Sequence, residues 1–384
     1  MLEKIIIKNI NSIDVCEIDF KSGNYKFLNE NLFDNLINPV VIYGRNGSGK
    51  TAVMNAMSHF ISMMSFPPES ISPFIVNNFR FERYQIDKKN PEDIIGNIEL
   101  FFTLNKDQYN YLLETSRDNF ISHEYLKVND KIYFEQKNNS YLYKNKKYSF
   151  QNKTTSKMIP FLRVLSSSEI TDSVIQTVFT YIKSFTHVNV SRINQGGFVT
   201  SSLFSNTNIF DLLTSHSNET REIFKQYKTF PIYSIVKDNK VLPNGLMMQQ
   251  YNFVLNDEDF EGKLPYQMIS TGMQNQSVLL SLLLSMPEES VMFIDEADIA
   301  LHPTIIKAFL DVLHQKKVQI VMTLHNTYAM QFMRPDQIYL AKWVKGYSSY
   351  YRLSKIYPNI REINNIEKMY LSLLFDEAIN EQDK

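Results

Sequence analysis

The stretch "GRNGSGKT" at residues 44–51 constrains the fold of this chain more than any other feature of the sequence. Four residues separate Gly44 from the triplet Gly49, Lys50 and Thr51, which is the spacing of a phosphate-binding loop. The apolar run "NPVVIYG" precedes the loop and predicts a buried strand, whereas "TAVMNAMSHFISMMS" follows it with the apolar spacing of a helix. The sequence therefore predicts an α/β fold built around a strand, loop and helix unit.

The loop is expected to hold the phosphates of a nucleotide. Glycines let its backbone N–H groups point inward and approach the anion closely. Lys50 would neutralise the β- and γ-phosphates, and the Thr51 hydroxyl would hold Mg²⁺ at the positive end of the following helix. The expected nucleotide-binding residues of the loop are Gly44, Arg45, Asn46, Gly47, Ser48, Gly49, Lys50 and Thr51. An ordinary glycine turn before a core helix is the alternative, and the flanking strand and helix argue against it.

A second motif, "VMFIDEAD", is an apolar run that ends in two carboxylates. A buried strand ending at Asp295 would place this side chain at the carboxyl edge of a parallel sheet, within reach of the metal held by Thr51. Glu296 would then accept a hydrogen bond from a water aligned on the γ-phosphate and act as the general base. Alone, such a pair is more often a solvated turn. Together with the loop, it predicts a catalytic site.

Two further motifs could complete this site. In "ISTGMQNQ", Ser270, Gly272 and Gln274 stand at the start of an apolar helix and could form a second anion site. If both sites cannot reach one nucleotide within a monomer, a head-to-tail pair of subunits could bring them together; a simple N-cap serine is the alternative. In "IVMTLHN", His325 ends an apolar strand, where it could contact the γ-phosphate or serve only as a structural histidine.

The rest of the chain divides into three segments. Residues 1–150 contain the loop and β-rich runs that predict an antiparallel section, and residues 151–245 predict an inserted, mainly helical lobe. Residues 246–384 alternate helix and strand patterns, which predicts more of the same parallel sheet, followed by a helical tail. The pattern "EQKNNSYLYKNKKYSF" indicates a twisted hairpin rather than low complexity.

Composition limits the class of protein. Forty basic and forty-one acidic side chains give a net charge of -1, which does not indicate a nucleic-acid binder but leaves room for a local basic face. Cys16 is the only cysteine, which excludes an internal disulfide and fits a reducing compartment. The N-terminus "MLEKIIIKNI" lacks the pattern of a signal peptide, and no apolar run is long enough to span a membrane. We therefore expect a cytoplasmic protein with no membrane partner.

In this order, the four motifs resemble the heads of ABC-type ATPases. The sequence is most similar to the bacterial "AAA family ATPase" proteins of the RloA, AbiL and overcoming-lysogenization-defect type, which occur in phage-defence loci. The flanking stretches "IIIKNINSID", "EYLKVNDKIYFEQ", "MRPDQIYLAKW" and "IREINNIEKMYL" carry the resemblance over most of the chain. It implies a P-loop NTPase fold: an ABC-ATPase-like head with an antiparallel β section and an inserted, mainly helical lobe.

The resemblance also implies roles for individual residues. Lys50 and Thr51 would bind ATP and Mg²⁺. Asp295 would also bind the metal, and Glu296 would align the attacking water. Ser270 and Gly272 would contact the ATP of a second subunit, and His325 would sense the γ-phosphate. The turn after the acidic strand, with Asp298 and His302, would contact the other subunit. The sequence departs from the family pattern at Met273, where transporter relatives often have a second glycine, and at Thr271. Gln85 is the nearest candidate for a metal-contacting glutamine, and a plain surface residue is the alternative.

Three functions follow as hypotheses. The first is an ATP-hydrolysing subunit that forms ATP-sandwich homodimers or higher oligomers and controls a separate effector, such as a nuclease or toxin, in phage defence by abortive infection. Related proteins with their own nuclease carry it after the histidine strand, where this chain has only the expected helical tail. The second is a DNA-repair ATPase that binds DNA across its dimer, which the absence of coiled-coil arms disfavours. The third is a nucleotide-binding scaffold with negligible turnover, which would have no need of Glu296.

Overall fold

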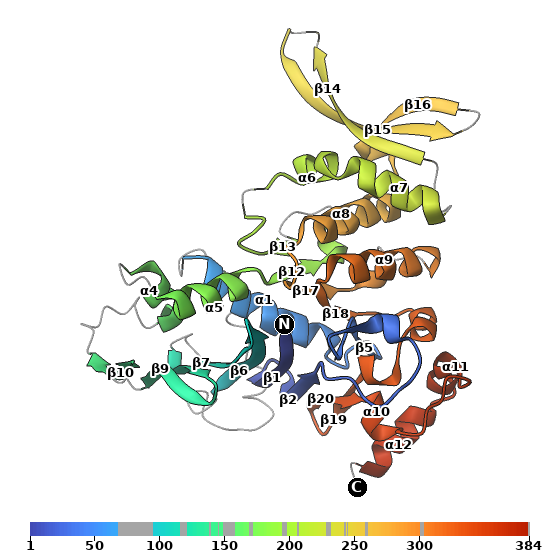
Figure 1. The fold of residues 1–384 in the computed structure, drawn as a ribbon. Helices are drawn as coiled ribbons and strands as arrows, with labels where there is room; N and C mark the ends of the chain where they lie inside the picture. Colours follow the sequence, from blue (N-terminus) through green and yellow to red (C-terminus); the bar gives the residue numbers. More distant parts are fainter. Residues whose placement is uncertain are drawn as a thin grey trace.

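The computed structural model describes most of the chain and contains one large mixed sheet. The described residues are 1–67, 95–115, 121–137, 140–144, 146–148, 158–168, 172–193, 198–205, 207–227, 232–241, 243, 245–257, 260–299 and 303–382. The strand order of the 15-stranded sheet is β11-β10-β9-β8-β7-β6-β1-β2-β20-β19-β5-β18-β17-β12-β13. Helices cover both faces near β5 and β17, and a smaller sheet projects from one end of the molecule (Figure 1).

The large sheet changes character along its length. Its antiparallel part contains β1 (Leu2–Ile10), β2 (Ile13–Asp19), β6 (Gly96–Leu104), β7 (Asp107–Thr115), β8 (Ile121–Val128), β9 (Lys131–Lys137), β10 (Ser140–Tyr143) and β11 (Lys146–Tyr148). The other part contains β5 (Val40–Gly44), β12 (Thr186–Asn189), β13 (Val199–Thr200), β17 (Val291–Asp295), β18 (Gln319–Thr323), β19 (Ile338–Val344) and β20 (Tyr347–Arg352). Within it, β19, β5, β18, β17 and β12 are parallel to their neighbours in that order. The alternating helix and strand patterns predicted β17 and β18 as parts of this parallel sheet.

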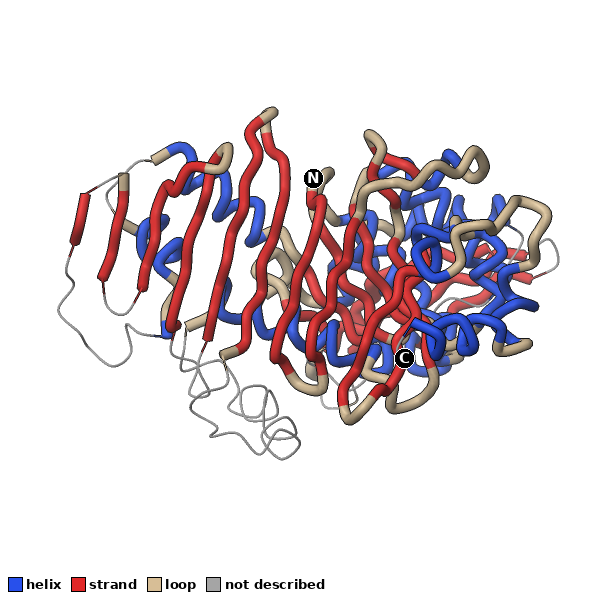
Figure 2. The backbone as a smooth tube through the Cα atoms, turned by 90° about the horizontal axis from the view of Figure 1, so that it is seen from below, coloured by secondary structure: helices blue, strands red, loops and turns tan. Residues whose placement is uncertain are grey.

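Parallel strands that are buried on both faces separate two hydrophobic cores. In β5, Val40 and Ile42 point into one core and Val41 and Tyr43 into the other, because side chains alternate between the faces of a strand. The first core lies under α1 (Lys50–Ser65), α4 (Phe161–Ser167) and α5 (Ser173–Lys183). Among the described residues, Figure 2 shows helices on one face of the antiparallel strands.

The second core lies under α8 (Thr271–Ser285) and α9 (Pro303–Lys316). Helices α6 (Ile209–Ser215) and α7 (Ser217–Tyr227) lie next to α8, and beyond them stands the three-stranded sheet of β14 (Ile232–Val241), β15 (Met247–Asp257) and β16 (Phe260–Pro265). This sheet comes immediately before the segment that leads into α8. No pattern in the sequence predicted these three strands.

The C-terminal region contains more than the expected helical tail. Strands β19 and β20 first form an antiparallel hairpin inside the large sheet. Only then follow α10 (Leu353–Ile356), α11 (Ile366–Leu371) and α12 (Leu374–Gln382), which pack beside β19 and near residues 44–48. No helix among the described residues combines the length and the apolar character that a membrane crossing needs.

The expected division into three segments remains a prediction. Residues 151–245 do contain α4, α5, α6 and α7, but they also contribute β12 to the large sheet, where it pairs with β17. The same segment contributes β13 and β14. The middle of the chain therefore contains helices together with strands, one of which pairs with β17 in the large sheet.

Candidate nucleotide-binding site

The predicted phosphate-binding loop joins β5 to α1. Gly44 is the last residue of β5, Lys50 is the first of α1, and Gly47 and Gly49 have φ values of 78° and 99°. These left-handed conformations strain any residue with a Cβ. At Gly49 a Cβ atom would also lie 2.0 Å from Ser348 Oγ of β20, so both the backbone and the space at this position require glycine.

The loop's lysine folds back onto the loop itself. Lys50 Nζ donates hydrogen bonds to the carbonyl oxygens of Gly44 at 2.7 Å and Arg45 at 3.2 Å. Burial lowers the pKa of its ammonium group, and the nearby carboxylates, Asp295 foremost, oppose that shift. A phosphate entering the loop would replace two neutral acceptors with charged ones, which make stronger hydrogen bonds.

The other loop side chains differ in their surroundings. Arg45 and Asn46 are exposed, and Arg45 forms an ion pair with Asp376 of α12 at 3.2 Å. The Ser48 hydroxyl is buried and has no hydrogen-bond partner among the described residues. A buried polar group without a partner is costly, so an acceptor or donor brought by a ligand would satisfy it.

The acidic strand lies where the sequence motif predicted. Asp295 ends β17, two strands from β5, and its Oδ1 accepts hydrogen bonds from Thr51 Oγ1 at 3.3 Å and Thr323 Oγ1 at 2.7 Å. Burial raises the pKa of the Asp295 carboxyl, and the hydrogen bonds from the two threonines oppose that shift. Thr323 also accepts a hydrogen bond from the Glu296 backbone N–H at 2.8 Å. It is a site residue that the sequence reasoning missed.

Glu296 and His325 follow the ends of adjacent strands. Glu296 has φ 55°, an uncommon conformation for a residue with a side chain, and it is half-buried. His325 is exposed. The link between the two segments is Asp298, whose Oδ2 accepts hydrogen bonds from the backbone N–H groups of His325 and Asn326, both at 3.0 Å. The turn after the acidic strand thus holds the backbone that carries the histidine.

The serine-glycine motif begins α8, as expected. Ser270 is the exposed N-cap and its side chain accepts a hydrogen bond from the Met273 N–H at 3.4 Å, while open space surrounds Gly272. Gln274 differs from the expectation of a ligand-facing residue. It is buried, and its amide donates to the carbonyl oxygens of Tyr266 and Ile269 at 2.7 and 3.1 Å, which fixes the turn before the helix.

The structure brings together one group of predicted residues and leaves another apart. Lys50, Thr51, Asp295 and Glu296 converge at one edge of the sheet. Within the described part of the chain, no hydrogen bond joins Ser270 or Gly272 to residues 44–51. Gln85 and His302 lie outside the described residues.

The donors around Thr51 fit Mg²⁺. This ion binds hard oxygen ligands and usually takes one or two carboxylates together with waters and substrate phosphates. The Thr51 hydroxyl and the Asp295 carboxylate provide oxygen donors of this kind. No cluster of three or more His, Cys, Asp or Glu side chains suited to a metal occurs in the described ranges.

Comparisons with known proteins give the family and the fold of the chain. The family model described as "AAA domain, putative AbiEii toxin, Type IV TA system" matches residues 40–331. A solved SMC head bound to the C-winged helix domain of ScpA aligns with a TM-score of 0.51 and 14% identity, over 92% of this chain and 98% of that chain. An SMC head domain from Thermotoga maritima aligns with a TM-score of 0.43 and 12% identity, over 91% of this chain and 98% of that chain. No curated protein matches significantly. The likeness to the first structure supports the P-loop NTPase fold, of the SMC and ABC head type.

Proposed function

The chain belongs to this AAA-domain family, and we propose that it binds Mg·ATP at residues 44–51 and hydrolyses it. The observation that carries the proposal is the contact between Thr51 and Asp295, with Lys50 and Glu296 nearby. A phosphate-binding loop needs a cation for the phosphates and oxygen ligands for the metal, and hydrolysis needs a carboxylate to align water. Lys50, the oxygen atoms of Thr51 and Asp295, and Glu296 lie at the same edge of the sheet.

We propose one task for each of these residues. Lys50 would transfer its hydrogen bonds from the loop carbonyls to the phosphates. Asp295 would act in its ionised form, and a bound Mg²⁺ would neutralise phosphate charge. Glu296 would accept a proton from the attacking water, and Thr323 would hold the Glu296 backbone in position through the 2.8 Å hydrogen bond.

We further propose that the complete site forms between two copies of the chain. Ser270 is exposed at the start of α8, and a Cβ atom added at Gly272 would meet no other atom within 4 Å. Neither residue bonds to residues 44–51 within its own described chain. Two subunits in a head-to-tail pair would place Ser270 and Gly272 of each over the ATP of the other, and His325 would sense the γ-phosphate.

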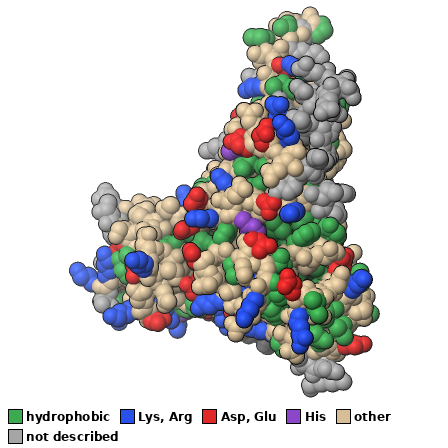
Figure 3. Space-filling view, turned by 45° about the vertical axis from the view of Figure 1, so that its right-hand side comes forward, with side chains coloured by type: hydrophobic (Ala, Val, Ile, Leu, Met, Phe, Trp, Pro, Cys, Tyr) green, Lys and Arg blue, Asp and Glu red, His purple; other side chains and the backbone are tan. Residues whose placement is uncertain are grey.

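The proposed output is control of a separate effector, such as a nuclease or toxin, in bacterial phage defence within the cytoplasm. This part rests on the family's own description and on the resemblance to defence-locus ATPases, so it is an argument by analogy. Figure 3 shows acidic and basic side chains interspersed over one face of the molecule, and the net charge is -1. Neither observation favours DNA as the main partner.

The test is phosphate release by the purified chain, with and without Mg²⁺, together with ATP binding. Lys50→Ala should lose ATP binding, whereas Glu296→Gln should bind ATP and release almost no phosphate. Glu296→Gln keeps the shape of the side chain and removes its ability to accept a proton. A variant that still binds ATP but no longer hydrolyses it would therefore identify Glu296 as the general base. Turnover by Glu296→Gln at the wild-type rate would show that Glu296 has no such role.

A further inference from the structure

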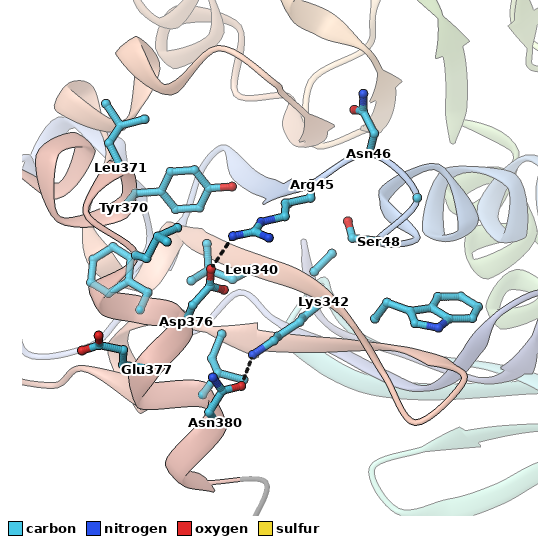
Figure 4. A pocket seen from close by; sticks show the side chains of 17 residues that line it. Arg45, Asn46, Ser48, Leu340, Lys342, Tyr370, Leu371, Asp376, Glu377 and Asn380 are labelled. Carbon is cyan, nitrogen blue, oxygen red and sulfur yellow. Dashed lines mark hydrogen bonds and ion pairs between the residues drawn. The ribbon is translucent and has the colours of Figure 1, made fainter.

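The loop's exposed cation is held by the C-terminal helix. Arg45 is the second residue of the phosphate-binding loop, and its Nη2 lies 3.2 Å from Asp376 Oδ2 of α12. Apart from Lys50, it is the only basic side chain in residues 44–51. Figure 4 shows Arg45 extending from the loop to this carboxylate on the opposite wall of a cleft.

Helix α12 holds its carboxylate in a fixed place. Phe375 and Ile379 are buried in the second core, with 2% and 1% of their surface exposed. Asp376 and Asn380, four residues apart, lie on the same face of the helix, and Asn380 Oδ1 accepts a hydrogen bond from Lys342 Nζ of β19 at 2.5 Å. Asp376 is thus positioned by packing, whereas the Arg45 side chain is 74% exposed and can change direction.

The cleft gives the guanidinium room to move. It measures about 970 Å³ and is bounded by residues 44–48 of the loop, residues 340–343 of β19 and the last two helices. Arginine binds carboxylate and phosphate oxygens with the same planar donor geometry. The carboxylate of Asp376 and the phosphates of a nucleotide in the loop are therefore alternative partners for one side chain.

We propose that Asp376 competes with the nucleotide's phosphates for Arg45, so that α12 restrains nucleotide binding by the loop. The proposal rests on the ATP site proposed above. When the phosphates capture Arg45, the link between the loop and α12 is broken. Nucleotide binding in the loop is thereby communicated to the C-terminal helices. A change that removes the Asp376 charge frees Arg45 before the nucleotide binds, so that Arg45 can contact the phosphates without first breaking the ion pair.

The test is equilibrium binding of Mg·ATP and of inorganic tripolyphosphate to the wild-type chain and its variants. Asp376→Asn should tighten binding of both ligands by up to about fivefold, the range of an exposed ion pair. Glu377→Gln removes the same charge from a neighbouring residue of the cleft that forms no bond with Arg45, and it should change binding by less than about twofold. In an Arg45→Gln background, Asp376→Asn should have no effect.

Two results would overturn this inference while leaving the ATP site intact. One is equal tightening by Asp376→Asn and Glu377→Gln, which would indicate a general charge effect. The other is a gain from Asp376→Asn that persists without Arg45. If the folded wild-type chain binds neither ligand, the proposed ATP site itself fails, and the competition fails with it. Unfolding curves of each variant verify that the compared proteins are folded.

Discussion

Thr51 Oγ1 donates a hydrogen bond to Asp295 Oδ1 across 3.3 Å, although 244 positions separate the two residues in the sequence. The parallel sheet explains how they meet. Strand β5 leads into the loop before Thr51, β17 ends at Asp295, and β18 between them contributes Thr323. Since parallel strands end at a common edge, three separate stretches of sequence deliver their oxygen donors to one place.

Removal of the Thr51 hydroxyl should weaken the use of Mg²⁺. We expect Thr51→Val to lower the affinity for Mg²⁺ in ATP hydrolysis by at least about tenfold, because one of the two protein oxygen donors is lost. Phosphate release measured over a Mg²⁺ titration tests this. Thr323→Ser keeps the hydroxyl that donates to Asp295 and is the matched control. An unchanged Mg²⁺ dependence in Thr51→Val would remove Thr51 from the metal site.

Gly49→Ala should destabilise the fold by about 1–3 kcal/mol, because it combines a left-handed backbone with a clash. Its Cβ would lie 2.0 Å from Ser348 Oγ and 2.5 Å from Ser348 Cβ. Denaturant unfolding measures the cost. Ser348→Gly in the same chain should recover part of it, and Gly272→Ala, which meets open space, should leave the free energy of unfolding nearly unchanged. Equal losses in Gly49→Ala and Gly272→Ala would contradict the assignment.

Glu124 should make stability depend on pH. Its buried carboxyl accepts hydrogen bonds from the backbone N–H groups of Phe161 and Leu162 and from the Tyr111 hydroxyl, yet burial raises its pKa from 4.5 to about 7. The folded state therefore retains a proton that the unfolded state loses above pH 4.5. The free energy of unfolding should fall, by on the order of 3 kcal/mol, as pH rises from 4.5 to about 7, and level off above.

Glu124→Gln provides the check on that pH dependence. Glutamine has nearly the same shape and does not titrate, so the fall in unfolding free energy over this pH range should be absent. Denaturant unfolding at a series of pH values measures it. A variant with the same pH profile as the wild type would place the titrating group elsewhere.

Local patterns predicted the strand, loop and helix around residues 44–51, because the apolar run of β5 and the helical spacing of α1 are strong and uninterrupted. The acidic strand was predicted in the same way, and its last residue, Asp295, contacts Thr51 after the loop. Short elements escaped prediction. Strand β12 has only four residues, "THVN", too few for a period to show, and its place beside β17 comes from tertiary packing.

Long-range polar contacts could not be predicted from the sequence either. Arg334 is completely buried, and its guanidinium donates to the Asp336 carboxylate and to the carbonyl oxygens of Gly23 and Phe27. Nothing in "FMRPDQ" distinguishes that arginine from a surface residue. The contact between Arg45 and Asp376 is of the same kind, because its partners are 331 positions apart and neither belongs to a recognisable pattern with the other.

We propose that ATP joins two copies of the chain through Ser270, and the mass of the Glu296→Gln variant in solution shows whether it does. With Mg·ATP bound and not hydrolysed, the variant should double in mass relative to its nucleotide-free form. Adding Ser270→Arg should prevent the doubling, whereas Ser285→Arg, at the other end of α8, should not. A Glu296→Gln variant that binds ATP and stays monomeric, or that dimerises equally well with Ser270→Arg, would contradict the account.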